Sequence, residues 1–226
     1  MPFFDDSGPK PEEATNPIAR SFALVKDQLE RLIVINLLWT LQCVPLILAW
    51  ALTMPFWLRI LLMAYTVIAL VPATGLLFSL TEQVNQGVPL EKDLVLQCLK
   101  RTWRPSLMRL LPLYSLFGLL GWAAYEAGLQ GWLLPGTLAQ LLLLLLAVIS
   151  LYWGGLFVER EELNPLDMSR ESANLFWRKP GLTLLIALVS LLVAIIGFAS
   201  IAGFFLIMPV LLALFQVQLF HSVVKG

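Results

Sequence analysis

Forty-five consecutive residues without Asp, Glu, Lys or Arg decide the fold class: PGLTLLIALVSLLVAIIGFASIAGFFLIMPVLLALFQVQLFHSVV (residues 180–224). A helix that crosses a bilayer needs about 20 apolar residues. This stretch is too long for one crossing and fits two, with a turn near residues 200–203. Uncharged stretches also occupy residues 32–58, 60–81, 110–125 and 127–158. The stretch at 110–125 reaches spanning length only if Arg109 extends its side chain toward the lipid headgroups.

We therefore predict an all-α, polytopic membrane protein with six transmembrane helices arranged as three hairpins. The predicted spans are at about 32–53, 57–81, 106–126, 133–157, 180–199 and 203–223. Residues 1–16 are acidic and rich in proline, and they predict a disordered cytoplasmic tail. Residues 17–226 form a single membrane domain in this interpretation.

The overall composition agrees with a membrane protein. Of 226 residues, 59% are hydrophobic and 13% are charged, against about 45–50% and 25% in soluble domains. These values exclude a soluble globular enzyme and a disordered chain. Lys plus Arg equals Asp plus Glu, at 15 each, so no net field attracts nucleic acid.

The distribution of basic residues predicts an orientation. With a cytoplasmic N-terminus and six crossings, 14 of the 15 basic residues lie on the cytoplasmic side, and Arg59 is the exception. Such a bias follows the positive-inside rule. Both termini are then cytoplasmic.

A threefold pattern recurs along the chain. Each unit has a proline about 13–15 residues before a basic residue, and a pair of spans follows; the pairs are Pro17 and Arg31, Pro89 and Arg104, and Pro165 and Arg178. The pattern predicts three amphipathic cytoplasmic helices, each followed by a hairpin. Alternatively, it reflects only the need of any such hairpin protein for basic connectors.

Short apolar motifs in the first two spans suggest a family. These are Asn36-Leu37-Leu38-Trp39 followed by Val44-Pro45, and Val71-Pro72-Ala73-Thr74-Gly75. In these motifs and in its layout the chain resembles the YesL-like family of bacterial membrane proteins, a domain of unknown function. The resemblance implies a location in the bacterial plasma membrane. It also implies an accessory role in carbohydrate uptake, because the family is often encoded beside carbohydrate ABC transporters.

No catalytic or cofactor-binding motif stands out. The sequence has no Walker A lysine, no GxGxxG, no CxxC pair and no HExxH. The single histidine, His221, has no Cys or carboxylate at ligand spacing, and Cys43 has no neighbouring base. We therefore expect no enzymatic activity, no cofactor and no metal.

Uncharged polar residues and prolines within the spans allow two interpretations. The residues are Asn36, Gln42, Pro45, Pro72, Thr74 and Gln140. They either join helices by hydrogen bonds and close packing, which we favour, or line a site for a neutral solute such as a sugar. Small residues at Gly75, Gly118, Gly121, Gly154 and Gly155 likewise predict close approach of helices.

The charged connectors carry aromatic residues suited to an interface. We single out Trp103, Arg104, Phe176, Trp177 and Arg178 as candidate partner-docking residues, with a lipid-anchored helix as an equal alternative. The function we expect is a non-enzymatic accessory or regulatory subunit of a carbohydrate ABC transporter, contacting its permease or ATPase. The alternative is a small carrier or channel for a neutral solute.

Overall fold

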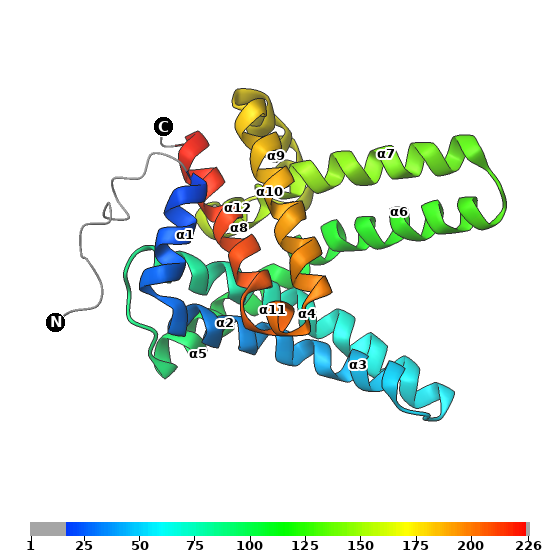
Figure 1. The fold of residues 1–226 in the computed structure, drawn as a ribbon, viewed down its shortest axis with the longest axis horizontal. Coiled ribbons are helices and arrows are strands. Elements are labelled where there is room, and N and C mark those ends of the chain that lie inside the picture. Colours follow the sequence, from blue (N-terminus) through cyan, green and yellow to red (C-terminus); the bar gives the residue numbers. More distant parts are fainter. Residues whose placement is uncertain (1–16, 225–226) are drawn as a thin grey trace.

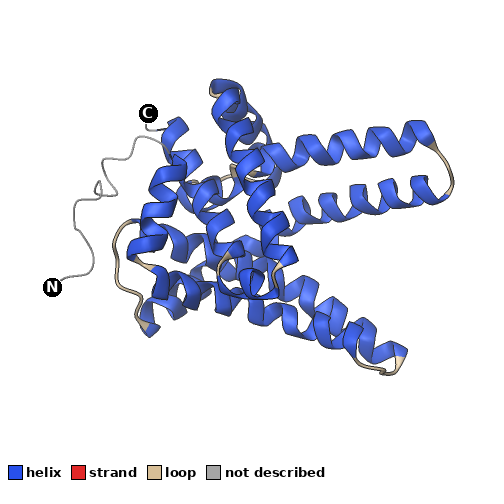
Figure 2. Cartoon of the chain, viewed as in Figure 1, coloured by secondary structure: helices blue, strands red, loops and turns tan. Residues whose placement is uncertain are grey.

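The computed structural model describes residues 17–224, so the predicted tail at residues 1–16 lies outside the described part. All regular structure in residues 17–224 is helical, as Figure 2 shows. The helices are α1 Pro17–Asp27, α2 Leu29–Thr40, the 3₁₀ turn η1 Leu41–Cys43, α3 Val44–Ala51, α4 Phe56–Asn85, α5 Lys92–Pro105, the π-helical turn η2 Ser106–Leu110, α6 Leu111–Leu129, α7 Leu133–Ser150, α8 Trp153–Glu159, α9 Pro165–Arg178, α10 Pro180–Ala199, α11 Ile201–Leu206 and α12 Met208–Val224. The all-α prediction is confirmed.

Five helical segments of the described chain are long and apolar enough to cross a membrane. They are Leu29–Ala51, Phe56–Asn85, Lys92–Leu129, Leu133–Ser150 and Pro180–Ala199. The sixth expected span, 203–223, is divided into α11 and α12, and α12 has 17 residues. Pro209 at the start of α12 is typical of a new helix, because proline has no N–H to continue the previous one.

Two further expected spans are interrupted, which hydropathy alone did not indicate. The segment 32–53 contains the 3₁₀ turn η1 just before Pro45, which then occupies the first turn of α3. The segment 133–157 breaks at residues 151–152, and the short helix α8 follows. The uncharged run was correctly located in both cases, but hydrophobicity says nothing about helix direction.

The second connecting helix is continuous with the span that follows it. α5, η2 and α6 form one segment over Lys92–Leu129, instead of a separate surface helix and span. A π-helical turn follows Pro105, which has no N–H for the helical ladder. Such wide turns absorb a local mismatch without ending the helix.

The apolar helix α12, which has 17 residues and is too short to count among the five spans, lies at the centre of the molecule. It packs against α1, α2, α4, α8, α9 and α10. Leu214, Phe215 and Leu219 are each no more than 1% exposed. Because protein surrounds α12 on most sides, its apolar residues form the core and do not need lipid around them.

The elements meet at one end of the molecule and separate at the other. We call the first the charged end; it comprises α1, the C-terminal turns of α4, α8 and α12, α5, and the segment 159–179. At this end Lys179 Nζ donates to the Ser222 carbonyl at 2.7 Å, and Gln28 Nε2 donates to the Val84 carbonyl at 3.4 Å.

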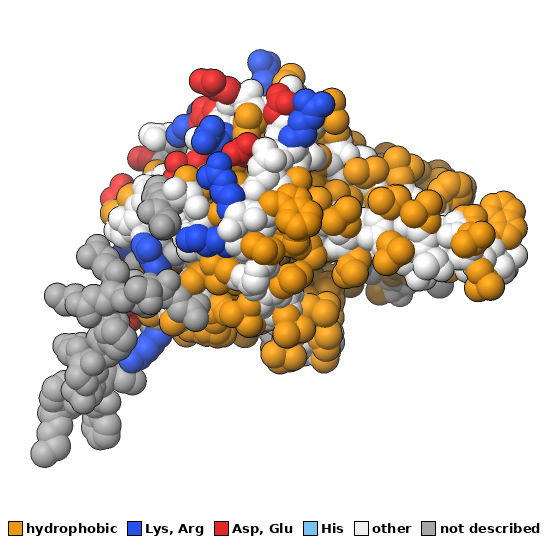
Figure 3. Space-filling model, turned by 90° about the horizontal axis from the view of Figure 1, so that it is seen from above, with side chains coloured by type: hydrophobic (Ala, Val, Ile, Leu, Met, Phe, Trp, Pro, Cys, Tyr) orange, Lys and Arg blue, Asp and Glu red, His pale blue; other side chains and the backbone are white. Residues whose placement is uncertain are grey.

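Away from the charged end, two helix pairs project in different directions (Figure 1). α3 pairs with α4, and α6 pairs with α7. We call the α6/α7 pair the arm. Hydrophobic side chains cover the part projecting to the right in Figure 3, while most of the Lys, Arg, Asp and Glu gather on the other side. This separation is typical of a protein that places one end in water and the rest in hydrocarbon.

Candidate functional site

Asn36 of α2 bridges the break between α11 and α12. Its Nδ2 donates to the carbonyls of Phe204 at 3.1 Å and Phe205 at 2.7 Å, and its Oδ1 accepts from the backbone N–H of Val210 at 2.9 Å. The side chain is fully buried. These backbone groups have lost helical partners at the break, so Asn36 replaces them. The hydrogen bonds of Asn36 thus join α2 to α11 and α12, as expected for a residue that packs helices together.

The two motifs that carry the family resemblance lie against each other. Trp39 Nε1 of α2 donates to Thr74 Oγ1 of α4 at 3.0 Å. At the next residue of α4, a Cβ on Gly75 would lie 1.9 Å from Ser106 Oγ, so the expected close approach at Gly75 is confirmed. Thr74 thus joins two helices, and it also donates to its own helix at the Leu70 carbonyl.

The remaining candidates within the spans are placed differently. Gln42 accepts from Tyr65 of α4 at 3.3 Å, and it lies half-buried within the 3₁₀ turn η1. Pro45 starts α3, and Pro72 is buried inside the unbroken helix α4. These residues serve local packing in the described fold.

Gln140 differs from the other polar candidates because it faces away from the protein. It lies near the middle of α7 and is exposed. Its side-chain amide makes no hydrogen bond with another described residue. An amide without a partner is costly in hydrocarbon, by several kcal/mol in the most apolar reference media.

A cavity of about 510 Å³ opens beside the arm, between α4, α6 and α12. Its wall is mostly apolar, and it includes Val67, Leu70 and Leu212. Four polar side chains also line it: Thr74, Tyr114, Ser115 and Gln216. Gly118 contributes to its width, because nothing lies within 4 Å of where its Cβ would be. The expected close approach at Gly118 and Gly121 is therefore wrong.

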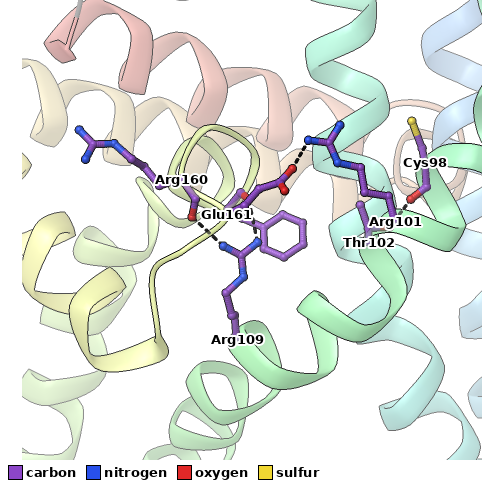
Figure 4. A network of polar contacts seen from close by, with 7 residues as sticks. Cys98, Arg101, Thr102, Arg109, Arg160 and Glu161 are labelled. Carbon is purple, nitrogen blue, oxygen red and sulfur yellow. Dashed lines mark hydrogen bonds and ion pairs between the residues drawn. The ribbon is translucent and has the colours of Figure 1, made fainter.

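Arg109 does not extend toward headgroups as expected. It is 6% exposed, and its guanidinium donates to the carbonyls of Phe157 at 2.9 Å and Arg160 at 2.8 Å (Figure 4). The guanidinium carbon lies 4.4 Å from the centre of the Phe157 ring. Arginine offers a planar fork that suits such paired acceptors. The side chain therefore stabilises the C-terminal end of α8, where Arg101 also pairs with Glu161.

The candidate docking residues on the connectors are mostly exposed. Trp103 and Trp177 are 45% and 75% exposed, and Arg104 and Arg178 are also exposed. Phe176 is half-buried and packs edge-on against Trp177, with 5.2 Å between the ring centres. All five belong to helices of the charged end, α5 and α9.

Two carboxylates and an imidazole converge at the charged end, which sequence reasoning missed. His221 Nε2 lies 3.5 Å from Glu82 Oε2 and 3.3 Å from Glu159 Oε1. One ligand atom from each of the three lies within 4.8 Å of the others. The Glu82 side chain is 4% exposed, whereas Glu159 is 35% exposed. We call these three residues the acid–histidine cluster.

The local fold explains how the cluster forms. Glu82 and His221 lie in the last turns of α4 and α12, and Glu159 ends α8. A Cβ on Gly155 would lie 2.3 Å from Phe220 Cβ. Gly154 is similarly tight, so the expected close approach of helices at both glycines is confirmed. Close packing of the α8 backbone against the Phe220 side chain of α12 brings Glu159 to His221.

The chain was compared with family models, curated proteins and solved structures, and none of them matches it. The resemblance to YesL-like proteins thus rests on the motifs around Asn36 and Pro72 and on the layout of the predicted spans. A function for this chain is therefore inferred from the geometry of the described residues.

Proposed function

We propose that the protein is a non-enzymatic membrane subunit that assists another membrane protein by binding it within the bilayer. The observation that carries this proposal is Gln140, an exposed amide in the middle of an arm that projects from the bundle. In a complex, a polar group on a neighbouring helix satisfies the amide, which removes its desolvation penalty.

The cavity beside the arm supports the same proposal. A groove of about 510 Å³ between membrane helices has to be filled, either by lipid chains or by a helix. Gln216 and Ser115 on its wall give a partner helix polar groups to recognise. A partner helix seated there also contacts α6, so one partner reaches both the cavity and the arm.

The partner we propose is the permease or ATPase of a carbohydrate ABC transporter. This part of the proposal rests on the resemblance to the YesL-like family. The exposed side chains Trp103 and Trp177 at the charged end offer a second contact surface, on the side where an ATPase binds its permease.

We place the protein in a bacterial plasma membrane, with six spans in three hairpins and the charged end in the cytoplasm. The sixth span in this arrangement is α11 and α12, with α12 shielded from lipid by its neighbours. The asymmetry of the basic residues supports the orientation.

Cysteine labelling tests the orientation. In a chain without Cys43 and Cys98, a cysteine at Trp103 or Trp177 is expected to react with an impermeant maleimide only after the membrane is opened. A cysteine at Gln130, in the turn of the arm, is expected to react in intact cells. Reaction of the cysteines at 103 and 177 from opposite sides would refute the arrangement.

Replacing Gln140 tests the proposed function. We expect Gln140→Leu to lower the amount of transporter subunit that co-purifies in mild detergent by at least threefold. The purified protein itself should melt no lower, because the variant removes an amide exposed to hydrocarbon.

The matched control is Gln130→Leu, the same change at the exposed turn of the arm, where water already satisfies the amide. It should retain the partner fully. If Gln140→Leu retains the partner as well as the control does, the amide has no part in binding. If the native protein is isolated without any transporter subunit, the proposed partner is wrong.

The alternative function, a carrier or channel for a neutral solute, draws on the four polar side chains of the cavity. Flux of sugars or polyols into liposomes that contain only this protein would favour it. Under our proposal, such liposomes show no flux above that of empty ones.

A further inference from the structure

We infer that the acid–histidine cluster of Glu82, Glu159 and His221 binds a divalent transition-metal ion, with Zn²⁺ the best match. The inference goes beyond the proposed accessory function and does not depend on it. It concerns the charged end alone, where α4, α8 and α12 are joined.

The distances between ligand atoms fit a metal site. A tetrahedral ion with bonds of about 2.0–2.1 Å holds its ligand atoms about 3.3–3.4 Å apart. The two separations measured from His221 Nε2 are 3.3 Å and 3.5 Å. All three ligand atoms lie within 4.8 Å of one another, so only a small adjustment of one carboxylate completes the three-ligand arrangement.

The environment of Glu82 favours a bound cation. Its carboxylate is almost fully buried, and no Lys or Arg of the described residues lies within 4.0 Å of it. A buried carboxylate needs a counter-charge and hydrogen bonds to offset its desolvation. Moreover, α4 and α12 both end here, and helix C-termini carry partial negative charge. A divalent cation compensates all of these charges together.

Neighbouring side chains hold the first carboxylate in place. Gln86 Nε2 donates to Glu82 Oε1 at 2.7 Å, which leaves Oε2 directed at His221. Asn85 lies 3.5 Å from that second oxygen, and Gln218 of α12 donates to Asn85 at 2.6 Å. Hydrogen bonds of this kind orient the ligands of most protein metal sites.

The donor set points to the class of metal. One imidazole nitrogen and two carboxylate oxygens suit Zn²⁺, Fe²⁺ or Mn²⁺ better than they suit Ca²⁺ or Mg²⁺. The latter two ions prefer ligand sets made of oxygen atoms only. Three protein ligands leave a fourth tetrahedral position, and Glu159 is sufficiently exposed for water to reach it. The ion ties the ends of three helices together and so stabilises the charged end.

Metal titration of the full chain in detergent tests the inference. The protein is purified through a tag without histidine, stripped with a chelator, and melted with and without Zn²⁺. We expect Zn²⁺ to raise the melting temperature by several degrees, because an ion that binds only the folded state stabilises it. Co²⁺ is expected to give the visible absorption of a tetrahedral site.

The variants Glu82→Gln and His221→Gln should lose both responses. The matched control Glu162→Gln changes an exposed carboxylate three residues from Glu159 and should keep both. Gln86→Leu should weaken Zn²⁺ binding by about 10–100-fold, as loss of an orienting hydrogen bond does.

A native protein that shows neither a melting shift nor the Co²⁺ absorption would overturn the inference. The same holds if Glu82→Gln responds as Glu162→Gln does. In either case the three side chains only pack the ends of α4, α8 and α12 against one another. Size-exclusion profiles distinguish lost binding from lost folding. Because no transporter is present in this experiment, its failure leaves the accessory function untouched.

Discussion

Replacing Asn36 with leucine is expected to destabilise the protein more than any other single change of a polar residue within the spans. The substitution removes two donated hydrogen bonds and one accepted from Val210. Interhelical hydrogen bonds in membranes are worth about 0.6 kcal/mol each, so the loss of three is about 1.8 kcal/mol. It is larger if the freed backbone groups stay unsatisfied. Thermal unfolding of the purified protein in detergent measures the effect.

Two comparisons separate the hydrogen bonds of Asn36 from its packing. Asn36→Asp keeps the volume but replaces the donors with an acceptor that faces the carbonyls of Phe204 and Phe205, so it should destabilise at least as strongly as leucine. Thr66→Val is the control, because buried Thr66 donates only within its own helix, to the Leu62 carbonyl. If the changes at positions 36 and 66 have equal effects, the bridge across the helix break contributes nothing.

The sequence was sufficient to locate the apolar segments along the chain, but it did not predict how the helices are arranged in space. An uncharged run such as 180–224 reports how much of the chain prefers hydrocarbon, and α10 begins and ends where its span was expected, at 180 and 199. The expected span 133–157 instead extends past the end of α7 at Ser150. The breaks at η1 and at residues 151–152 leave no mark on hydropathy. The central position of α12 also could not be predicted, because a helix buried in protein and one facing lipid have the same composition.

Arg109 illustrates the same limit at a single residue. A cation one turn inside an apolar run was expected to reach the headgroups. The fold instead brings the C-terminal carbonyls of α8 to the guanidinium, from 48 and 51 residues away along the chain. The sequence around Arg109 holds no signal of these acceptors, because a helix end far along the chain supplies them.

The acid–histidine cluster was missed for a related reason. Ligands for a metal ion were expected close to His221 in the sequence, whereas Glu82 and Glu159 lie 139 and 62 residues earlier. The usable signal was the pair Gly154-Gly155, which indicated that this segment approaches another helix closely, although not which one.

That close approach gives the second large prediction. A methyl group on Gly155 would lie 2.3 Å from Phe220 Cβ and 2.4 Å from Phe220 Cγ. The Cβ of Phe220 is fixed to the α12 backbone, so rotating the side chain cannot relieve the overlap, and α8 must move away from α12. Such overpacking costs about 1–3 kcal/mol. We therefore expect Gly155→Ala to lower the melting temperature by several degrees.

Gly118→Ala provides the matched control, since nothing lies within 4 Å of the added methyl group and alanine favours the helix. It should melt at the native temperature or slightly above. Gly155→Ala should also weaken Zn²⁺ binding, because the shift of α8 carries Glu159 away from His221, while Gly118→Ala leaves it unchanged. Equal melting temperatures for the two variants would mean that α8 does not pack closely against Phe220 of α12. The explanation given above for how Glu159 reaches His221 would then be wrong.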